Sequence, residues 1–167
     1  MPISDNLILG YQDTNEYSSR GFLRRKAIEK QAETLCKEFQ VKTPDARTPV
    51  GALSGGNAQK VIIARAISKK PDVLIVAQPT RGVDVGASEY IRGRIRQLRD
   101  EGTAILLVSA DLDEVMQLSD RIAVIYEGKI VCQVQADVLS DVELGMLMTG
   151  TSPEELKKSR GEGTEHA

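Results

Sequence analysis

The octet LSGGNAQK, residues Leu53–Lys60, decides how the rest of the chain is interpreted, and a helical run, Val61–Ala66, follows it directly. Ser54 is a residue type that favours a helix N-cap, while Gly55 and Gly56 lack a Cβ and let another backbone or a phosphate approach closely. The first turn of a helix has unpaired N–H groups and a partial positive charge. The octet therefore predicts an anion site at a helix N-terminus, although on its own it also fits an ordinary capped helix with two loop glycines.

The sequence on both sides of the octet alternates between helical and strand patterns. Two apolar runs are of the kind found in parallel strands buried on both faces. A β-α-β-α order predicts an α/β sheet with crossover helices. The expected elements are a loop at Tyr11–Gly21, an amphipathic helix over Ala27–Phe39, a loop at Val41–Val50, a helix at Gly55–Ser68, a strand at Asp72–Ala77, a helix at Gly86–Asp100, a strand at Thr103–Ser109, a helix opened by Asp111–Glu114, a hairpin over Arg121–Val134 and a helix opened by Ser140–Glu143.

Composition narrows the class of protein. The 167 residues are 41% hydrophobic and 28% charged, which is typical of a globular protein, and the net charge of −2 argues against a nucleic-acid-binding surface. Cys36 and Cys132 lack metal-ligand spacing and are interpreted as reduced thiols of a cytosolic protein. His166 is the only histidine and lies in a polar tail, which excludes a Ser–His–Asp triad in the body of the chain and a histidine-based metal cluster.

The order of the motifs resembles that of ATP-binding-cassette (ABC) ATPases. In this resemblance Leu53–Lys60 is the signature motif, Asp72–Ala77 is the Walker B strand, and Gln78–Asp84 leads through the D-loop. In that family the signature of one domain closes over the γ-phosphate of an ATP held by the partner domain. The resemblance thus implies nucleotide contacts in trans from Ser54, Gly55, Gly56 and Asn57, with the D-loop residue Asp84 beside them.

One run narrows the resemblance further. Ala77–Ala87 (AQPTRGVDVGA) is similar to the second, C-terminal cassette of bacterial importers for nucleosides or simple sugars, and so are Asn6–Tyr11 and Ser119–Gly128. The fold then expected is α/β: a partial ABC cassette with a helical subdomain and the C-terminal half of a RecA-like parallel sheet, ending in a β-hairpin. We expect residues 1–70 to form the helical subdomain with the signature helix, 71–150 the C-terminal part of the ATPase core, and 151–167 a polar tail, mostly disordered apart from a first helical turn.

The positions that carry hydrolysis in this family are altered. A competent Walker B strand ends in Asp-Glu, whereas this chain has Ala77 and Gln78. Ala77 has no ligand atom for Mg²⁺, and Gln78 can orient a water but cannot take its proton. The switch histidine is replaced by Ala110. Misalignment by one residue is the alternative, but Pro79–Thr80 and Asp84 stand at the expected distances. We therefore expect no catalytic residue and no metal ligand in this chain.

The phosphate-binding loop of the family, G-x-x-x-x-G-K-[S/T], is missing. In the nearest look-alike, Gly51–Asn57, an asparagine takes the place of the lysine, and Lys60 comes three residues too late. The chain is therefore interpreted as a fragment that begins inside the domain and is inactive alone. Without the first part of the sheet, the apolar strands near Val73 and Leu106 are expected to have uncovered edges and faces, which favours self-association. ATP and Mg²⁺ are expected in the full-length dimer of cassettes, and no cofactor is expected for the fragment by itself.

The resemblance also implies partners and location. The signature would complete a hydrolytic site with the first ATPase cassette of the same parent chain, and the helical subdomain would lean against transmembrane permease subunits. No nucleic-acid partner is expected. The parent would be an ATPase coupled to solute import, bound peripherally at the cytoplasmic face of the membrane. The basic cluster Arg24–Lys26 fits a contact with permease or lipid, or a solvated face.

Two alternatives stay open. The chain fits a fragment of a soluble ABC-type ATPase, of the sort used in translation or DNA repair, although such proteins would be expected to keep the catalytic glutamate where Gln78 stands. It also fits a non-enzymatic binding module built on an ABC-like sheet. Association with a permease separates the first alternative from the importer, and an upstream phosphate loop in the parent gene separates the second.

Overall fold

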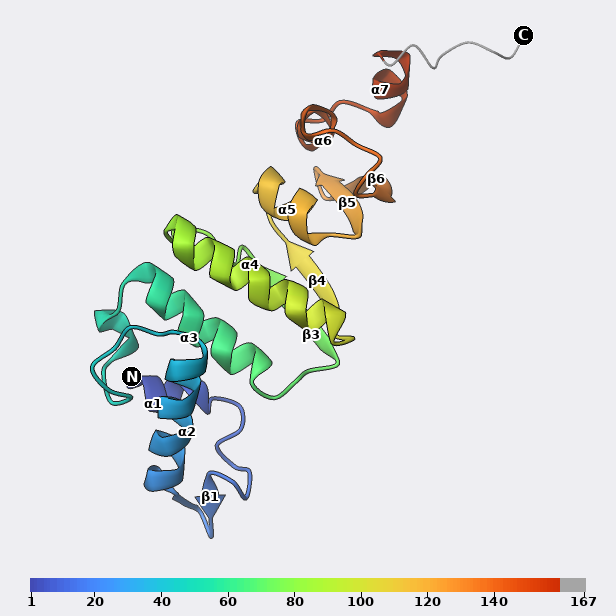
Figure 1. Ribbon diagram of the computed structural model, residues 1–167. Helices are drawn as coiled ribbons and strands as arrows, with labels where there is room; N and C mark the ends of the chain where they lie inside the picture. Colours follow the sequence, from blue (N-terminus) through green and yellow to red (C-terminus); the bar gives the residue numbers. More distant parts are fainter. Residues whose placement is uncertain (160–167) are drawn as a thin grey trace. The chain divides into compact units, whose positions relative to one another are not determined.

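The computed structural model describes residues 1–159 and consists of two compact units, and the division between them falls at residues 106 and 107 of the chain (Figure 1). The first unit spans Met1–Leu106 and the second begins at Leu107. Each unit is described by itself. The boundaries expected after residues 70 and 150 do not coincide with this division and stay predictions.

The first unit begins with a segment that pairs with a distant loop. Helix α1, Ile3–Leu7, is held because the Ile3 N–H donates to the Thr48 carbonyl at 3.0 Å and the Ser4 N–H donates to the Ala46 carbonyl at 2.9 Å. The stretch predicted as a plain loop ends in a small antiparallel hairpin of β1, Ser18–Ser19, and β2, Phe22–Leu23. Its turn residues Arg20 and Gly21 both have positive φ, the geometry of tight hairpins that periodicity does not reveal.

Helix α2, Arg25–Glu38, is the predicted amphipathic helix. Its buried face consists of Ile28, Ala32, Leu35 and Cys36. The helix ends at a left-handed residue, Gln40 with φ 51°, and the Val41 N–H bonds back to the Cys36 carbonyl at 2.8 Å. This is a Schellman ending, which closes the last turn and turns the chain sharply.

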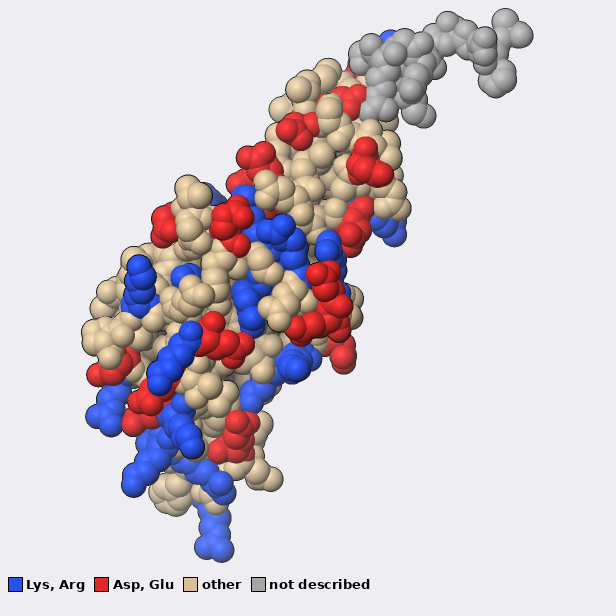
Figure 2. Space-filling view, viewed as in Figure 1, with Lys and Arg blue, Asp and Glu red and all other residues tan. Residues whose placement is uncertain are grey.

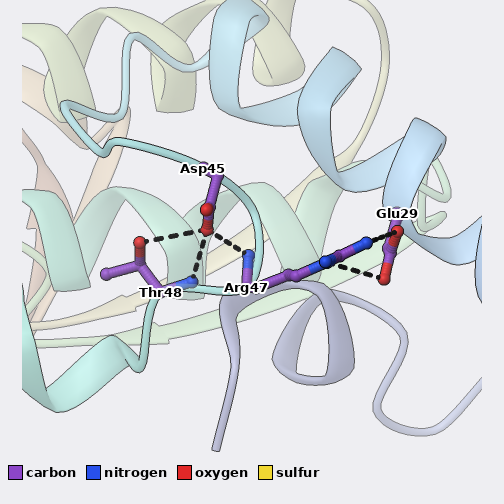
Figure 3. Close-up of polar contacts among 4 residues, drawn as sticks. All are labelled: Glu29, Asp45, Arg47 and Thr48. Carbon is purple, nitrogen blue, oxygen red and sulfur yellow. Dashed lines mark hydrogen bonds and ion pairs between the residues drawn. The ribbon is translucent and has the colours of Figure 1, made fainter.

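The loop that leads to the octet is ordered by side chains (Figure 3). The Asp45 carboxylate accepts from the backbone N–H groups of Arg47 at 2.8 Å and Thr48 at 3.0 Å. The Arg47 guanidinium makes two parallel bonds to Glu29 on α2, of 3.1 and 3.0 Å. The Arg47 bond holds the pKa of Glu29 below its usual range. The loop then passes through a short 3-10 turn, Val50–Ala52, and enters the next helix.

Lys and Arg side chains gather over the end of the first unit that carries β1 and α2 (Figure 2). Arg25 of this surface is paired with Asp5 of α1, so part of the basic cluster has a structural role. Arg24 and Lys26 are exposed. The predicted contact of this cluster with a permease or with lipid stays a prediction.

Two helices and two strands complete the first unit. Helix α3, Gly55–Ile67, and helix α4, Val85–Asp100, lie side by side (Figure 1). Strands β3, Val73–Ala77, and β4, Ala104–Val108, are hydrogen-bonded neighbours. The Ala104 N–H donates to the Asp72 carbonyl at 2.9 Å, so the two strands start together, as parallel strands joined by a crossover helix do. The α/β cassette fold predicted from the sequence is therefore confirmed over this part.

Of the two expectations for these strands, burial on both faces is wrong, and uncovered faces near Val73 and Leu106 are confirmed. A continuous apolar run predicts burial on both faces, yet β3 alternates: Leu74 and Val76 are buried, while Val73 and Ile75 are 64% and 69% exposed. Leu106 of β4 is also exposed, at 56%. Nothing in the first unit covers this face of β3 among the described residues. The apolar run indicates that β3 is suited to burial on both faces, but in this structure only one of its faces is covered.

The second unit is a hairpin covered by helices. Helix α5, Leu112–Leu118, is capped by Asp111, and strands β5, Arg121–Tyr126, and β6, Lys129–Gln135, pair antiparallel. Helix α6, Asp141–Met148, begins with the predicted capping box at Ser140 and Glu143. The core of this unit is formed by Ile122, Val124, Leu144, Leu147 and Leu156.

The start of the tail is helical for longer than expected. Helix α7, Pro153–Ser159, extends beyond the single predicted turn, and its Leu156 is 5% exposed in the core of the second unit. A disordered tail from residue 151 is therefore wrong for the first part of that range, because one apolar residue anchors the helix. The predicted disorder of residues 160–167 lies outside the described residues.

Candidate functional site

Ser54 occupies the predicted N-cap position of α3, with φ −63° and ψ 156°, but it does not act as a cap. Its side chain makes no hydrogen bond to the backbone of α3, a helix that the structure describes in full. Instead the Asn57 amide Nδ2 donates to the Ser54 Oγ at 2.9 Å. Because the Ser54 oxygen accepts this bond, its own O–H is directed elsewhere, and the first turn of α3 keeps its N–H groups for another acceptor.

Asn57 is held from the other side by the chain after α2. Its Oδ1 accepts from the backbone N–H of Lys42 at 2.8 Å. A backbone N–H is a donor, so it faces the oxygen of the Asn57 amide and not its NH₂. This bond therefore fixes the orientation of the amide and places its NH₂ toward Ser54. Sequence reasoning missed Lys42, because its contribution is a backbone N–H that any residue except proline supplies.

Gly55 and Gly56 are required by a contact within this chain. A Cβ on Gly55 would lie 3.3 Å from the carbonyl oxygen of Gly82, and a Cβ on Gly56 would lie 3.0 Å from both the Ala87 Cβ and the Asp84 carboxylate. The turn before α3 therefore packs directly on the turn before α4. The groups that approach these glycines belong to the same chain, and the approach of another molecule's backbone or of a phosphate stays a prediction.

Asp84 has a structural role at this contact. Its carboxylate accepts from the Ala87 N–H at 2.9 Å and caps α4. Gly82 and Ala87 were not singled out from the sequence. The sequence signals them only as small residues. The absent side chain of Gly82, which has a φ of 72°, and the small side chain of Ala87 permit the approach to Gly55 and Gly56.

The positions expected to be degenerate lie at the end of β3. Ala77 is the last residue of the strand and presents an exposed methyl group. Gln78 follows with a left-handed backbone, φ 50°, and the Arg81 N–H donates to its carbonyl at 3.2 Å. Pro79 and Thr80 after it are buried. The two residues at the end of β3, Ala77 and Gln78, thus lie in a turn closed by a backbone bond, and neither is acidic.

Ala110 belongs to the second unit. It is exposed and lies between Ser109, whose Oγ accepts from the Asp111 N–H at 3.1 Å, and Asp111, which caps α5 with a 3.0 Å bond from the Glu114 N–H. The predicted switch position therefore has a defined local structure and a side chain without polar atoms.

The residues of the turn before α3 fit a phosphate group better than a metal ion. The backbone N–H groups at the start of α3 and the hydroxyl of Ser54 are donors, which suits an anion and repels a cation. Across residues 1–159 no group of three or more His, Cys, Asp or Glu side chains is placed to hold a metal. Across the same residues no helix has the length and apolar character needed to cross a membrane. Ser54, Gly55, Gly56 and Asn57 are thus the candidate phosphate contacts.

Comparisons with known proteins show what the chain as a whole is similar to. The family model for ABC transporters matches residues 3–81. The chain is 47% identical over 160 residues to a guanosine import ATP-binding protein, NupO, of Bacillus subtilis, which covers 96% of the chain and 31% of the relative. It is 47% identical over 150 residues to a nucleoside import ATP-binding protein, NupA, of Lactococcus lactis, with 90% and 30% covered. A ribose import ATP-binding protein, RbsA, of Oceanobacillus iheyensis is 45% identical over 122 residues, with 73% and 25% covered.

Solved structures agree on the fold. A post-hydrolysis dimer of an ATP-binding cassette bound to ADP and Pi matches with a TM-score of 0.64 at 23% identity, covering 81% of this chain and 57% of the other. A second ABC transporter cassette matches with a TM-score of 0.65 at 20% identity, covering 94% and 62%. The chain spans about a third of the length of the curated relatives it matches. It therefore has the fold of an ABC ATPase cassette in part and is related to the ATP-binding proteins of nucleoside and ribose importers.

Proposed function

From this relationship to ABC importer ATPases we propose that the chain is part of the ATP-binding subunit of an importer for nucleosides or simple sugars, within the second of two cassettes. Its signature turn, Ser54–Asn57, completes an ATP site whose Walker motifs belong to the first cassette. The site that contains Ala77 and Gln78 does no chemistry. The part of the chain that contributes to catalysis is thus its contact in trans.

The observation that carries the proposal is the construction of the turn before α3. The Ser54 hydroxyl is oriented by Asn57 at 2.9 Å, Asn57 is oriented by the Lys42 N–H at 2.8 Å, and α3 starts without a side-chain cap from Ser54. Donors held in this way need no reorganisation to meet negative charge, which is the property of an effective transition-state contact.

The proposal also states that the end of β3, at Ala77 and Gln78, does not hydrolyse ATP. Hydrolysis of ATP requires a metal ligand and a group that positions the attacking water. Ala77 supplies neither, and Gln78 supplies only the second. We therefore place Mg²⁺ and the Walker B carboxylates of the hydrolytic site on the first cassette, and we expect the cassette that contains this chain to bind nucleotide at most.

The same proposal gives the partners and the location. The first cassette of the parent chain would face Ser54–Asn57 and Asp84, and permease subunits would contact the helical part of the first unit. The protein would act at the cytoplasmic face of the membrane. The three relatives described above are all named as import ATP-binding proteins, which favours import over the soluble ABC-type ATPase and over the non-enzymatic module.

A pair of substitutions in the full-length subunit, assembled with its permease in liposomes, tests the proposal. Ser54→Arg places a bulky cation in the signature turn, and we expect ATP hydrolysis to fall by ~100-fold or more. Gln78→Ala should change hydrolysis by no more than about twofold, because no chemistry depends on that side chain. Ser19→Arg, an exposed position in β1, is the matched control. A large loss from Gln78→Ala, or activity retained by Ser54→Arg, would overturn the assignment.

A titration of this chain alone with Mg-ATP, followed by amide chemical shifts, provides a second test. We expect no saturable shifts, because a signature turn meets ATP only when a partner cassette holds it. Saturable binding with a defined set of shifted amides would identify a nucleotide site within the chain, and the trans-only role would then be wrong.

A further inference from the structure

We propose that the turn after α2, Glu38–Lys42, is a positioning element that holds the signature turn and helix α4 in one fixed register, with Arg94 and Tyr90 as its positioning residues. The inference rests on the proposed function and extends it. It explains how the two elements offered to the partner cassette, the turn before α3 and the turn before α4, stay aligned.

The first contact joins this turn to α4. The Arg94 guanidinium donates to the Glu38 carboxylate at 2.9 Å, and the Tyr90 hydroxyl donates to the Glu38 backbone carbonyl at 3.0 Å. These donors are four residues apart on α4 and therefore lie on one face of that helix. Two bonds to one residue fix both the position of the α2 terminus along α4 and its rotation.

Ring contacts strengthen the same junction. The Arg94 guanidinium lies 4.6 Å from the centre of the Phe39 ring, and Phe39 is 1% exposed. The Lys60 ammonium of α3 lies 4.8 Å from the centre of the Tyr90 ring and donates to the Gln40 carbonyl at 3.3 Å. Cation–ring contacts of this length are attractive and sensitive to geometry. The turn after α2 is thus bonded to α4 and to the signature helix at the same place.

The last contact reaches the signature itself. The Lys42 N–H, at the end of the same turn, donates to the Asn57 side chain, which in turn orients the Ser54 hydroxyl. A continuous path therefore runs from Arg94 and Tyr90 through Glu38–Lys42 to Asn57. A shift of the turn relative to α4 would move the Lys42 N–H and with it the donor that holds Ser54.

Helices α3 and α4 are also in contact at a second place, near their N-termini. Gly56 of α3 packs on Ala87 and Asp84 at the start of α4, so the two helices touch near their N-termini as well as at Tyr90 and Lys60. Two separated contacts between a pair of helices determine their relative rotation, which one contact cannot do. Holding α4 in this way keeps the D-loop and the signature as a single surface for the partner.

The test uses the chemical shifts of two groups at the end of this path, which a lower global stability alone does not move, together with the exchange rate of one of them. In this chain, the side-chain amide of Asn57 and the backbone amide of Lys42 are followed by NMR in Arg94→Met and Tyr90→Phe, with Arg99→Met, an exposed arginine of the same helix bonded to Asp100, as the matched control. We expect both signals to shift in the first two variants and the Lys42 amide to exchange about 10-fold faster with solvent. Arg94→Lys keeps the charge facing Glu38 and should restore part of the shift.

Signals that move no more in Arg94→Met and Tyr90→Phe than in Arg99→Met would overturn the inference, even if those variants melt at a lower temperature. If Arg94→Met fails to fold, Tyr90→Phe carries the test by itself, since it removes a single hydroxyl and keeps the ring over Lys60. The hydroxyl bond is thus tested separately from packing.

Hydrolysis by the full-length subunit gives a second readout. Arg94→Met should lower kcat by about 5–10-fold and leave the KM for ATP unchanged, because the Walker motifs that hold the nucleotide are elsewhere. If Ser54→Arg abolishes hydrolysis but Arg94→Met behaves as Arg99→Met does, only the positioning role is wrong. If Ser54→Arg leaves hydrolysis intact, the proposed function itself is wrong.

Discussion

The turn before α3 and the turn after β3 each lead into a long helix of the first unit, α3 and α4, yet the two turns are built in different ways. At the first, side chains and missing side chains decide the geometry: Asn57 orients Ser54, and Gly56 lets α4 approach to 3.0 Å. At the second, a backbone bond from the Arg81 N–H to the Gln78 carbonyl closes the turn at 3.2 Å, and Gln78 has a left-handed backbone. The difference teaches that the turn after β3 forms with Ala77 and Gln78 in it, neither of which is acidic, whereas the turn before α3 depends on the side chain of Asn57 and on the missing side chain of Gly56.

Gly56→Ala should be the most damaging single methyl group in this comparison. The added Cβ meets the Ala87 Cβ and the Asp84 carboxylate at 3.0 Å, so α3 and α4 must separate, which costs about 1–3 kcal/mol. Gly51→Ala is the matched control, because among residues 1–159 no atom lies within 4 Å of the Cβ it adds. Thermal unfolding of both variants measures the difference. Equal melting temperatures would mean that the contact of α3 with α4 yields without cost.

Asn57→Leu should have the next largest effect. It removes the acceptor of the Lys42 N–H and the donor to Ser54, and each bond contributes about 1 kcal/mol to the free energy of unfolding. Gln59→Leu, in the next position but one of α3, removes a similar amide as a control. Denaturant unfolding gives the two free energies. A loss no larger than that of the control would show that water replaces both bonds and that the turn is not side-chain-directed.

Gln78→Gly should stabilise the protein by about 0.5–1 kcal/mol, because glycine adopts the φ of 50° at that position without strain. Gln40→Gly, at φ 51° after α2, should act in the same direction. Gln133→Gly, within β6, is the opposite control and should destabilise by about the same amount. Chemical denaturation ranks the three. A destabilised Gln78→Gly would mean that the glutamine side chain holds the turn, and the contrast between the two turns would disappear.

The sequence predicted most of the fold because its signals are local. The apolar run at Val73–Ala77, the helical spacing before Phe39 and the capping box at Ser140 each act over a few residues, and the structure confirms the elements they predict. The two-residue hairpin at Ser18–Leu23 was missed because its strands are too short for a period to show. The exposed face of β3 was expected from the missing first part of the sheet, while the apolar run alone predicted burial, because a strand pattern does not state what covers it.

The candidate site was predictable only in part. The octet pointed to Ser54 and the two glycines, since those residue types carry a recognisable chemistry. The bond from Asn57 to Ser54, in place of a Ser54 cap, was not predictable, because both arrangements use the same residues. Lys42 contributes its backbone N–H and Gly82 its backbone carbonyl. Almost every residue type has these groups, so the sequence does not reveal their role.

The smallest predicted effect concerns the far end of the signature helix, where Lys69 follows α3. The Lys69 ammonium donates to the Glu16 carboxylate at 2.8 Å and to the Tyr17 hydroxyl at 3.1 Å. The hydrogen bond from Lys69 is the largest cause that lowers the pKa of Glu16, and the bond from Tyr17 is the next largest. A carboxyl whose pKa is lowered by folding stabilises the protein above its unfolded pKa of about 4.3, and this contribution is lost as the pH falls through the lower folded pKa.

Because the Glu16 side chain is 52% exposed and water screens the pair, we expect the loss to be about 0.5 kcal/mol or less. The free energy of unfolding of the protein should thus decline more steeply below about pH 4.3 than that of Glu16→Gln. Parallel pH profiles for the protein and Glu16→Gln would show that the Lys69 pair does not stabilise this end of α3. The signature turn would then depend on the contacts at its N-terminal end alone, which are the bonds from Lys42 and the close packing of Gly56.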